Sequence, residues 1–185
     1  MFPKAVAFAE KCFSAVFGKE LAEWLKWRLR WLIREKYLIG VFPVVIDQGK
    51  VLLIKKRLGV SGMGQWQVPG GGKGRLMPED AAIRELREET GIIAKGLVLI
   101  HAGCSEKHRD FHLVYLVTSF EGRIAVGDTR EIADAKFVPF LDLQRYLTGE
   151  HLEYAERAFV RRTMNYLAER CVANDMELQT LQPTS

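Results

Sequence analysis

Three glutamates, Glu85, Glu88 and Glu89, stand three and four residues apart in a strongly charged segment of the chain. At about 100° per residue in a helix, this spacing places all three carboxylates on one face. Like charges at such spacings repel one another, and a divalent cation would remove the repulsion. Carboxylate oxygens suit Mg²⁺ or Mn²⁺, and Mg²⁺ commonly binds a few carboxylates together with substrate phosphates. The pattern therefore predicts a metal site formed by these three side chains.

The residues around these glutamates favour a short helix from Pro78 to Thr90. Proline suits the first helical position, and Gly91 suits the left-handed residue that ends a helix. Met77 is a poor N-cap, so the start of the helix is less well secured than its end. A glycine-rich run precedes the helix and would let the backbone approach phosphates closely. A solvated surface helix is the alternative interpretation of a segment rich in Glu and Arg.

The run Arg-Glu-Leu-Arg-Glu-Glu-Thr-Gly-Ile, from Arg84 to Ile92, resembles the second half of the Nudix box, G-x5-E-x7-R-E-U-x-E-E-x-G-U, where U is a bulky aliphatic residue. Gly70 stands where the box has its first glycine. Leu76 stands where the box has a glutamate, and the loop before the helix is one residue shorter than is usual in the family. The resemblance extends over residues 37–143, including Trp66-Gln67-Val68-Pro69 before the box.

This resemblance implies an α+β fold, the Nudix-type α/β/α sandwich with a mixed β-sheet. It also implies hydrolysis of a phosphoanhydride in a nucleoside diphosphate linked to another moiety, with Mg²⁺ or Mn²⁺ held by the three glutamates. The catalytic residues that it implies are Arg84, Glu88, Glu89 and Glu131. Glu131 belongs to a later segment that resembles the family, where an acidic residue often assists the metal or the water. An exposed turn residue is the alternative interpretation of Glu131.

Leu76 sets this sequence apart from the family, because the missing glutamate usually braces the box arginine. Arg84 then needs another partner, and Glu88 and Asp80 are candidates. We expect reduced metal affinity or an altered optimum, with inactivity as the extreme outcome. A catalytically weakened Nudix-like domain that binds a nucleotide and serves as a regulator is therefore the alternative function.

Positively charged side chains can contact the phosphates of a substrate, and glycines let the backbone approach those phosphates closely. The candidates for substrate binding are Lys55, Arg57, Gly70, Gly71 and Lys73. A solvated strand or loop residue is the alternative interpretation of each of the three side chains among them. Three histidines, His101, His108 and His112, lie near Cys104, but their spacing is not that of a zinc site. We expect His108 and Asp110 to lie in a loop, and loops of such folds often carry substrate contacts.

Hydrophobic periodicity places these residues on further elements. We expect a β-hairpin with strands 41–46 and 51–54 around a turn at 47–50, and later strands at 98–102, 111–120 and 135–138. A helical turn at 141–146 and a long amphipathic helix at 150–170 follow. Strands first, one helix in the middle and one at the end favour the α+β class with a mixed sheet.

The chain has 185 residues, which fits one domain with an addition. We divide it into a helical extension at 1–36, a Nudix domain at 37–170 and a polar tail at 171–185. Hydrophobic residues make up 48% and charged residues 27%, so disorder of the whole chain is excluded. A net charge of +4 is too small to predict nucleic acid as a partner, although capped RNA stays open. Three cysteines without a CxxC pair favour a reducing, cytoplasmic compartment.

The first 36 residues carry two amphipathic patterns, at 2–17 and 19–36. The second holds Trp24, Trp27 and Trp31 among basic residues, which suits peripheral contact with a membrane surface. The alternative is packing against the domain or against a second copy of the chain in a homodimer. Lys4, Glu10 and Lys11 interrupt the apolar stretch at 2–17, so a signal peptide for export is not expected. No window approaches the roughly 18 apolar residues of a spanning helix, so membrane spanning is not expected either.

Overall fold

The computed structural model describes residues 37–57, 64–105, 109–127 and 129–180, together with Trp24 and Arg28. The chain divides into two units, Met1–Lys36 and Tyr37–Ser185. The second unit contains, in chain order, β1 (Leu38–Asp47), β2 (Lys50–Lys56), β3 (Trp66–Gln67), β4 (Gly71–Gly72), α3 (Pro78–Thr90), β5 (Ile93–Ser105), β6 (Asp110–Glu121), β7 (Ile132–Pro139), the 3₁₀ helix η1 (Phe140–Arg145) and α4 (Gly149–Thr180).

The strands form one mixed sheet in the order β3-β2-β1-β6-β5, with β4 paired to β1 and β7 paired to β2. β1 and β6 run parallel, whereas β5 and β6 are antiparallel along most of their length. β5 is longer than the predicted strand at 98–102, because β6 offers it a partner at nearly every residue. The mixed sheet predicted from the sequence is confirmed.

The predicted hairpin connects β1 and β2. Asp47 pairs with Lys50 across the turn, and the two turn residues, Gln48 and Gly49, have φ angles of 45° and 74°. Two positive φ angles are typical of the type I′ turn, whose twist matches that of the flanking strands.

Beyond this hairpin, the segment from Trp66 to Gly72 crosses between the two strands. β3 pairs with the end of β2, and β4 pairs with Gly40 and Val41 of β1. Gly70 lies at the crossing, where a Cβ atom would come within 2.4 Å of the Val41 carbonyl oxygen. Only glycine fits this close approach, which brings the glycine-rich loop to the centre of the sheet.

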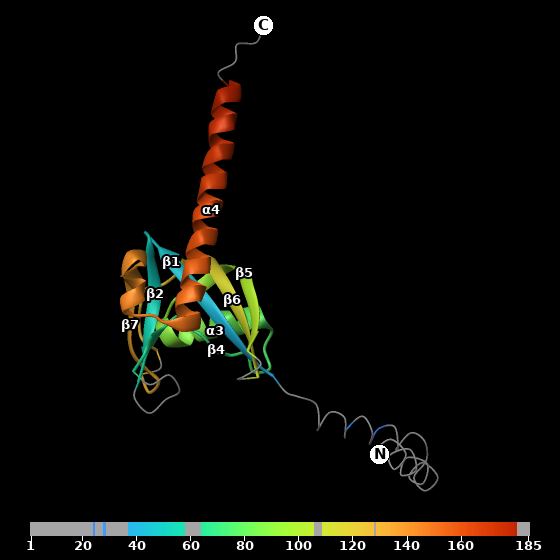
Figure 1. The fold of residues 1–185 in the computed structure, drawn as a ribbon, viewed down its shortest axis with the longest axis vertical. Coiled ribbons are helices and arrows are strands. Elements are labelled where there is room, and N and C mark those ends of the chain that lie inside the picture. The colour runs from blue at the N-terminus through green and yellow to red at the C-terminus, as the bar shows by residue number, and fades with distance from the viewer. Residues whose placement is uncertain are drawn as a thin grey trace. The chain divides into compact units, whose positions relative to one another are not determined.

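The two long helices cover opposite faces of the sheet (Figure 1). Ala81, Ala82 and Leu86 of α3 pack in apolar clusters with β1, β2, β5 and β6. Tyr154, Ala155 and Ala158 of α4 belong to a separate cluster that includes Val44, Leu53 and Leu116 of the sheet. These two cores, one on each face, confirm the α/β/α sandwich of the predicted α+β class.

α4 spans 32 residues and ends at Thr180, beyond the end at residue 170 expected from the sequence. Residues 171–180 contain neither proline nor glycine, so nothing in this stretch stops a helix that has already formed. In the part of the chain that the structure describes, no helix is long and apolar enough to cross a membrane.

The helices expected at 2–17 and 19–36 lie outside the described residues, except for Trp24 and Arg28. Both of these residues are helical, and the Arg28 guanidinium lies 5.0 Å from the centre of the Trp24 ring.

Candidate active site

α3 carries the three glutamates on the helix predicted from the sequence. Pro78 occupies the first turn, Glu79 and Asp80 complement the helix dipole, and Met77 provides no side-chain cap. Gly91 ends the helix with a φ of 74°, and its N–H donates to the Arg87 carbonyl at 2.9 Å. The packed face of α3 against the sheet therefore holds the carboxylate face in a fixed orientation.

Glu89 is the most buried of the three glutamates. Its Oε1 accepts a hydrogen bond from Lys56 Nζ at 2.7 Å, and its Oε2 accepts one from the Gly70 N–H at 2.8 Å. Burial raises the pKa of Glu89 to about 7, although both donors act to lower it. Glu89 thus joins the end of β2 and the glycine loop to α3.

Arg84 and Glu85 form a second pair at the mouth of the loop. Arg84 Nη2 hydrogen-bonds Glu85 and also donates to the Gly72 carbonyl at 3.0 Å. Burial raises the pKa of Glu85 above its usual range, against the opposing effect of Arg84. A Cβ atom on Gly71 would lie 2.6 Å from Glu85 Oε2, so the loop backbone passes directly over this carboxylate.

Arg84 Nε is buried without a hydrogen-bond partner, and Glu88 Oε2 lies 3.9 Å away. Glu88, one of the two partners expected for Arg84, is therefore near it only at the limit of an ion pair. Leu76 is 39% exposed, and it interacts with the loop through its backbone, whose carbonyl accepts a hydrogen bond from Lys73 Nζ at 2.9 Å.

Glu131 reaches the same place from the residue before β7. Its Oε2 lies 3.8 Å from Lys56 Nζ, and its carbonyl accepts the Arg57 N–H at 2.7 Å. The backbone bond ties this segment to the end of β2. The side chain of Glu131 is half-exposed, as is that of Glu88.

These side chains line one pocket of about 290 Å³. Its walls contain Glu85, Glu88, Glu89, Glu131 and Lys56, with Gly70–Gly72 along one side. A second pocket of about 440 Å³ adjoins it, because Gly71 and Gly72 line both. We refer to them as the carboxylate pocket and the adjoining pocket.

The donor set of the carboxylate pocket suits a divalent cation, since four carboxylates are the hard oxygen ligands that Mg²⁺ and Mn²⁺ prefer. As the side chains lie, however, no three acidic, histidine or cysteine residues of the described segments converge closely enough to hold a metal ion. Glu85 and Glu89 turn to Arg84 and Lys56 instead. The donor set therefore fits a divalent cation chemically, and two of the four carboxylates are engaged in ion pairs in this structure.

A model of the NUDIX domain family matches residues 36–159. The chain belongs to the Nudix family. Among solved structures, it is similar to a MutT NUDIX hydrolase from Burkholderia pseudomallei, with 26% identity, coverage of 66% of this chain and 98% of that one, and a TM-score of 0.59. No protein with a curated description matches the sequence.

Two further solved structures share the fold at lower identity. The Escherichia coli ORF135 protein is 21% identical, with coverage of 69% of this chain and 91% of its own and a TM-score of 0.56. The NUDIX domain of Shewanella oneidensis NrtR, solved in complex with ADP ribose, is 20% identical, with coverage of 82% and 97% and a TM-score of 0.54.

Within this Nudix domain, the structure brings together most of the residues singled out from the sequence. Arg84 and the three glutamates share the α3 face, and Glu131, Gly70 and Gly71 lie against it. Lys73 lines the adjoining pocket rather than the carboxylate pocket. Arg57 contributes its backbone N–H to the site, and its side chain is exposed.

Lys55 and Lys56 lie on opposite faces of β2. Lys55 Nζ lies 6.0 Å from the centre of the Trp66 ring, away from the carboxylates, whereas Lys56 reaches Glu89. Sequence reasoning named Lys55 and omitted Lys56. β2 is buried on both faces, so its residues show no alternation from which the sequence could assign a face.

The adjoining pocket contains an acid and a histidine held in place by α4. His112 Nε2 lies 3.0 Å from Asp110 Oδ2, and its Nδ1 is hydrogen-bonded to Tyr154. Asp110 Oδ1 is buried without a hydrogen-bond partner. His108 lies outside the described residues, and His101 packs against the Tyr154 ring. Phe42 and Leu38 contribute apolar walls to this pocket.

Proposed function

We propose that this Nudix domain hydrolyses a phosphoanhydride in a nucleoside diphosphate linked to another moiety. The observation that carries the proposal is the carboxylate pocket, in which four glutamates and Lys56 face the glycine loop. Membership of the Nudix family and likeness to a MutT NUDIX hydrolase support hydrolysis as the general chemistry.

Mg²⁺ or Mn²⁺ would be held by Glu85, Glu88 and Glu89. The Arg84–Glu85 and Lys56–Glu89 ion pairs would open to release two of these carboxylates. A divalent cation supplies charge neutralisation to a diphosphate and increases the acidity of water. Lys56 would then be released from Glu89 and could contact a phosphate oxygen at the same end of β2. The backbone at Gly70 and Gly71 would bring peptide groups close to the phosphates.

Water attacks one phosphorus atom, a new P–O bond forms, and the anhydride P–O bond breaks to release the other phosphate. One carboxylate accepts the proton of the attacking water. Glu131 suits this role best, because its side chain is half-exposed in the same pocket and is not one of the three proposed metal ligands. Arg84 would position Glu85 and the loop through its hydrogen bond to the Gly72 carbonyl.

The moiety linked to the diphosphate would occupy the adjoining pocket, which shares Gly71 and Gly72 with the carboxylate pocket. Its apolar walls suit the face of a ring, and the unpartnered Asp110 Oδ1 suits an N–H or O–H donor. A nucleotide-type ligand is supported by the Shewanella oneidensis domain solved with ADP ribose. A small molecule is therefore the proposed partner, with capped RNA as a substrate to be tested.

A regulatory domain that binds a nucleotide without turnover is the second candidate. Two observations favour it: Leu76 replaces the box glutamate, and the described carboxylates do not converge on a metal position. A cytoplasmic location and peripheral membrane contact through residues 19–36 remain predictions from the sequence. Cys104 carries a free, exposed thiol, which suits a reducing compartment.

The test is product release from a panel of nucleoside diphosphate derivatives and capped RNA, with Mg²⁺ or Mn²⁺ and with a chelator. Glu88→Gln and Glu89→Gln are compared with Glu153→Gln, an exposed control on α4. The hydrolase predicts metal-dependent turnover that falls by about 10² or more in the first two variants and persists in the control. Tight nucleotide binding without turnover on the whole panel would favour the regulator instead.

A further inference from the structure

We propose that the outer face of α4 is an interface at which two copies of this chain associate through parallel α4 helices. We call this face the outer stripe and define it by Val160, Met164 and Leu167. The inference is independent of the proposed hydrolysis.

α4 has two apolar faces, and the sheet covers one of them. Tyr154, Ala155 and Ala158 are buried against the domain. Val160 and Met164 are 60% and 61% exposed, and Leu167 is 51% exposed. At 100° per residue, Val160 is turned by about 140° from Ala155, so the outer stripe faces away from the core of its own domain.

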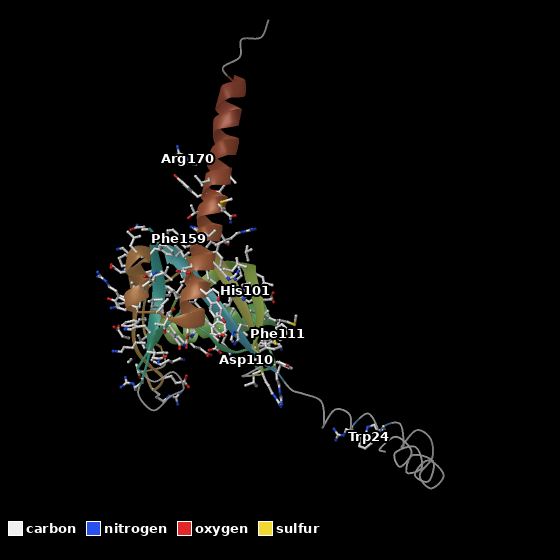
Figure 2. All side chains as sticks on the ribbon, in the orientation of Figure 1. Trp24, His101, Asp110, Phe111, Phe159 and Arg170 are labelled. Atoms are coloured by element: carbon white, nitrogen blue, oxygen red, sulfur yellow. The ribbon has the colours of Figure 1, made fainter. Side chains whose placement is uncertain are left out.

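The helix continues well past the sheet. Figure 2 shows Phe159 at the level of the domain and Arg170 further along α4, where no other described segment of the second unit runs beside the helix. An isolated helix in water gains little stability from propensity alone, and most helices are held by packing of an apolar face. An uncovered apolar face on a projecting helix therefore indicates a missing partner.

The outer stripe has the spacing of a coiled coil. Val160, Met164 and Leu167 follow one another at four and three residues, and the sequence continues this alternation at Cys171, Asn174 and Leu178. A repeat of 3.5 residues keeps one seam facing a partner helix when two helices supercoil to the left.

The charges beside the stripe select a second copy in parallel orientation. In a parallel pair, a residue at heptad position g faces position e of the partner, five residues further along. This rule pairs Glu156 with Arg161 of the other copy, and Arg170 with Asp175. Both pairs join opposite charges and occur twice by symmetry. The third pair, Thr163 with Ala168, is uncharged.

The sheet edge next to the stripe extends the apolar surface. A groove of about 540 Å³ lies between β5 and α4. It is lined by Leu99 and Ile100 on the strand and, on the helix, by Val160 and Met164 together with the charged residues Glu156, Arg157 and Arg161. Leu99 is half-exposed at the edge of the sheet. A partner helix on the outer stripe would therefore cover part of this edge as well.

Sedimentation of the full chain over a range of concentrations tests the proposal. We expect a reversible monomer–dimer equilibrium for the wild-type protein. Leu167→Asp should weaken the dimer at least tenfold, whereas Leu141→Asp, the same change at an exposed leucine of η1, should leave it intact. Circular dichroism confirms that both variants fold.

Charge exchange tests the orientation. Arg161→Glu places two glutamates opposite each other and should weaken the dimer, and the double variant Glu156→Arg with Arg161→Glu should restore it. A wild-type chain that stays monomeric at all concentrations would overturn the proposal. That result would agree instead with residues 1–36 of the same chain covering the outer stripe. A dimer that survives Leu167→Asp, or a double variant without restoration, would contradict the parallel α4 interface.

Discussion

Lys56 Nζ and Glu89 Oε1 lie 2.7 Å apart, and both side chains are almost fully buried. A buried carboxylate of this kind is expensive to ionise, which is why the pKa of Glu89 rises to about 7 even beside a lysine. The pair connects the last residue of β2 to the second half of α3. It also occupies two groups that the proposed chemistry needs, a metal ligand and a cation near the phosphates.

Lys56→Met should therefore destabilise the metal-free protein in a pH-dependent way. A folded-state pKa above the unfolded value favours folding at low pH, and this contribution is lost as the pH rises through about 7. Without Lys56 the pKa of Glu89 rises further, so the loss of stability should be small at pH 5 and about 2 kcal/mol or more at pH 8. Denaturant unfolding at both pH values measures it, and Lys55→Met is the matched control. An equal loss at the two pH values would show that packing, not charge, is what Lys56 supplies.

Leu76→Glu should return a carboxylate to the loop before α3. Arg84 Nε is buried without a hydrogen-bond partner. A glutamate at position 76 would restore the family residue that usually braces this arginine, and Arg84 in turn contacts Glu85 and Gly72. We expect tighter Mn²⁺ binding by about tenfold, measured by titration calorimetry, and a matching gain in turnover. Arg75→Glu adds a carboxylate one residue earlier and serves as the control. Equal gains in both variants would point to general charge rather than a brace on Arg84.

Gly70→Ala should destabilise the domain by about 2 kcal/mol or more, because the added Cβ meets the Val41 carbonyl and the Phe42 side chain. Gly72→Ala is the control two residues away, since a Cβ there meets nothing within 4 Å. Thermal unfolding of the two variants measures the difference. If both variants lose stability equally, Gly70 does not approach the Val41 carbonyl as closely as the structure shows.

His151 should make stability fall in mild acid. Burial, with a smaller effect from His112 and Lys56, lowers the pKa of His151 to about 4 from an ordinary 6.5. The unfolded chain then binds the proton more readily, so stability present above pH 6.5 is lost as the pH falls towards 4, by about 3 kcal/mol at most. His151→Phe removes the titration and keeps an aromatic ring against Phe42 and Tyr154. Its unfolding free energy should change less between pH 7 and pH 4.5 than that of the wild-type protein.

Much of the fold could be predicted because local signals and the fold agree. Gln48-Gly49 favour a hairpin turn, and the structure has the turn there. Pro78 favours the start of a helix and Gly91 its end, and α3 begins and ends at these positions. The end of α4 could not be placed, because its last ten residues are polar yet contain no helix breaker. The length of β5 depends on pairing with β6, which is a property of the assembled sheet.

The site was predictable where one helix carries it. Glu85, Glu88 and Glu89 share a face by spacing alone, and the structure places them in one pocket. Lys56 was missed because a strand buried on both faces hides which lysine points to which side. His112 contacts Tyr154 and Glu150 of α4, about 40 positions away in the chain, so the sequence alone gives no sign of these contacts.

The most direct test is to incubate the protein with a nucleoside diphosphate derivative and Mg²⁺ or Mn²⁺ in ¹⁸O-labelled water. The masses of the phosphate products are then measured by mass spectrometry. Hydrolysis of a phosphoanhydride in the carboxylate pocket predicts that one phosphate product gains one ¹⁸O atom, that a chelator abolishes the gain, and that Glu88→Gln nearly abolishes it. Absence of label from every phosphate product, or labelling that is unchanged in Glu88→Gln, would contradict it.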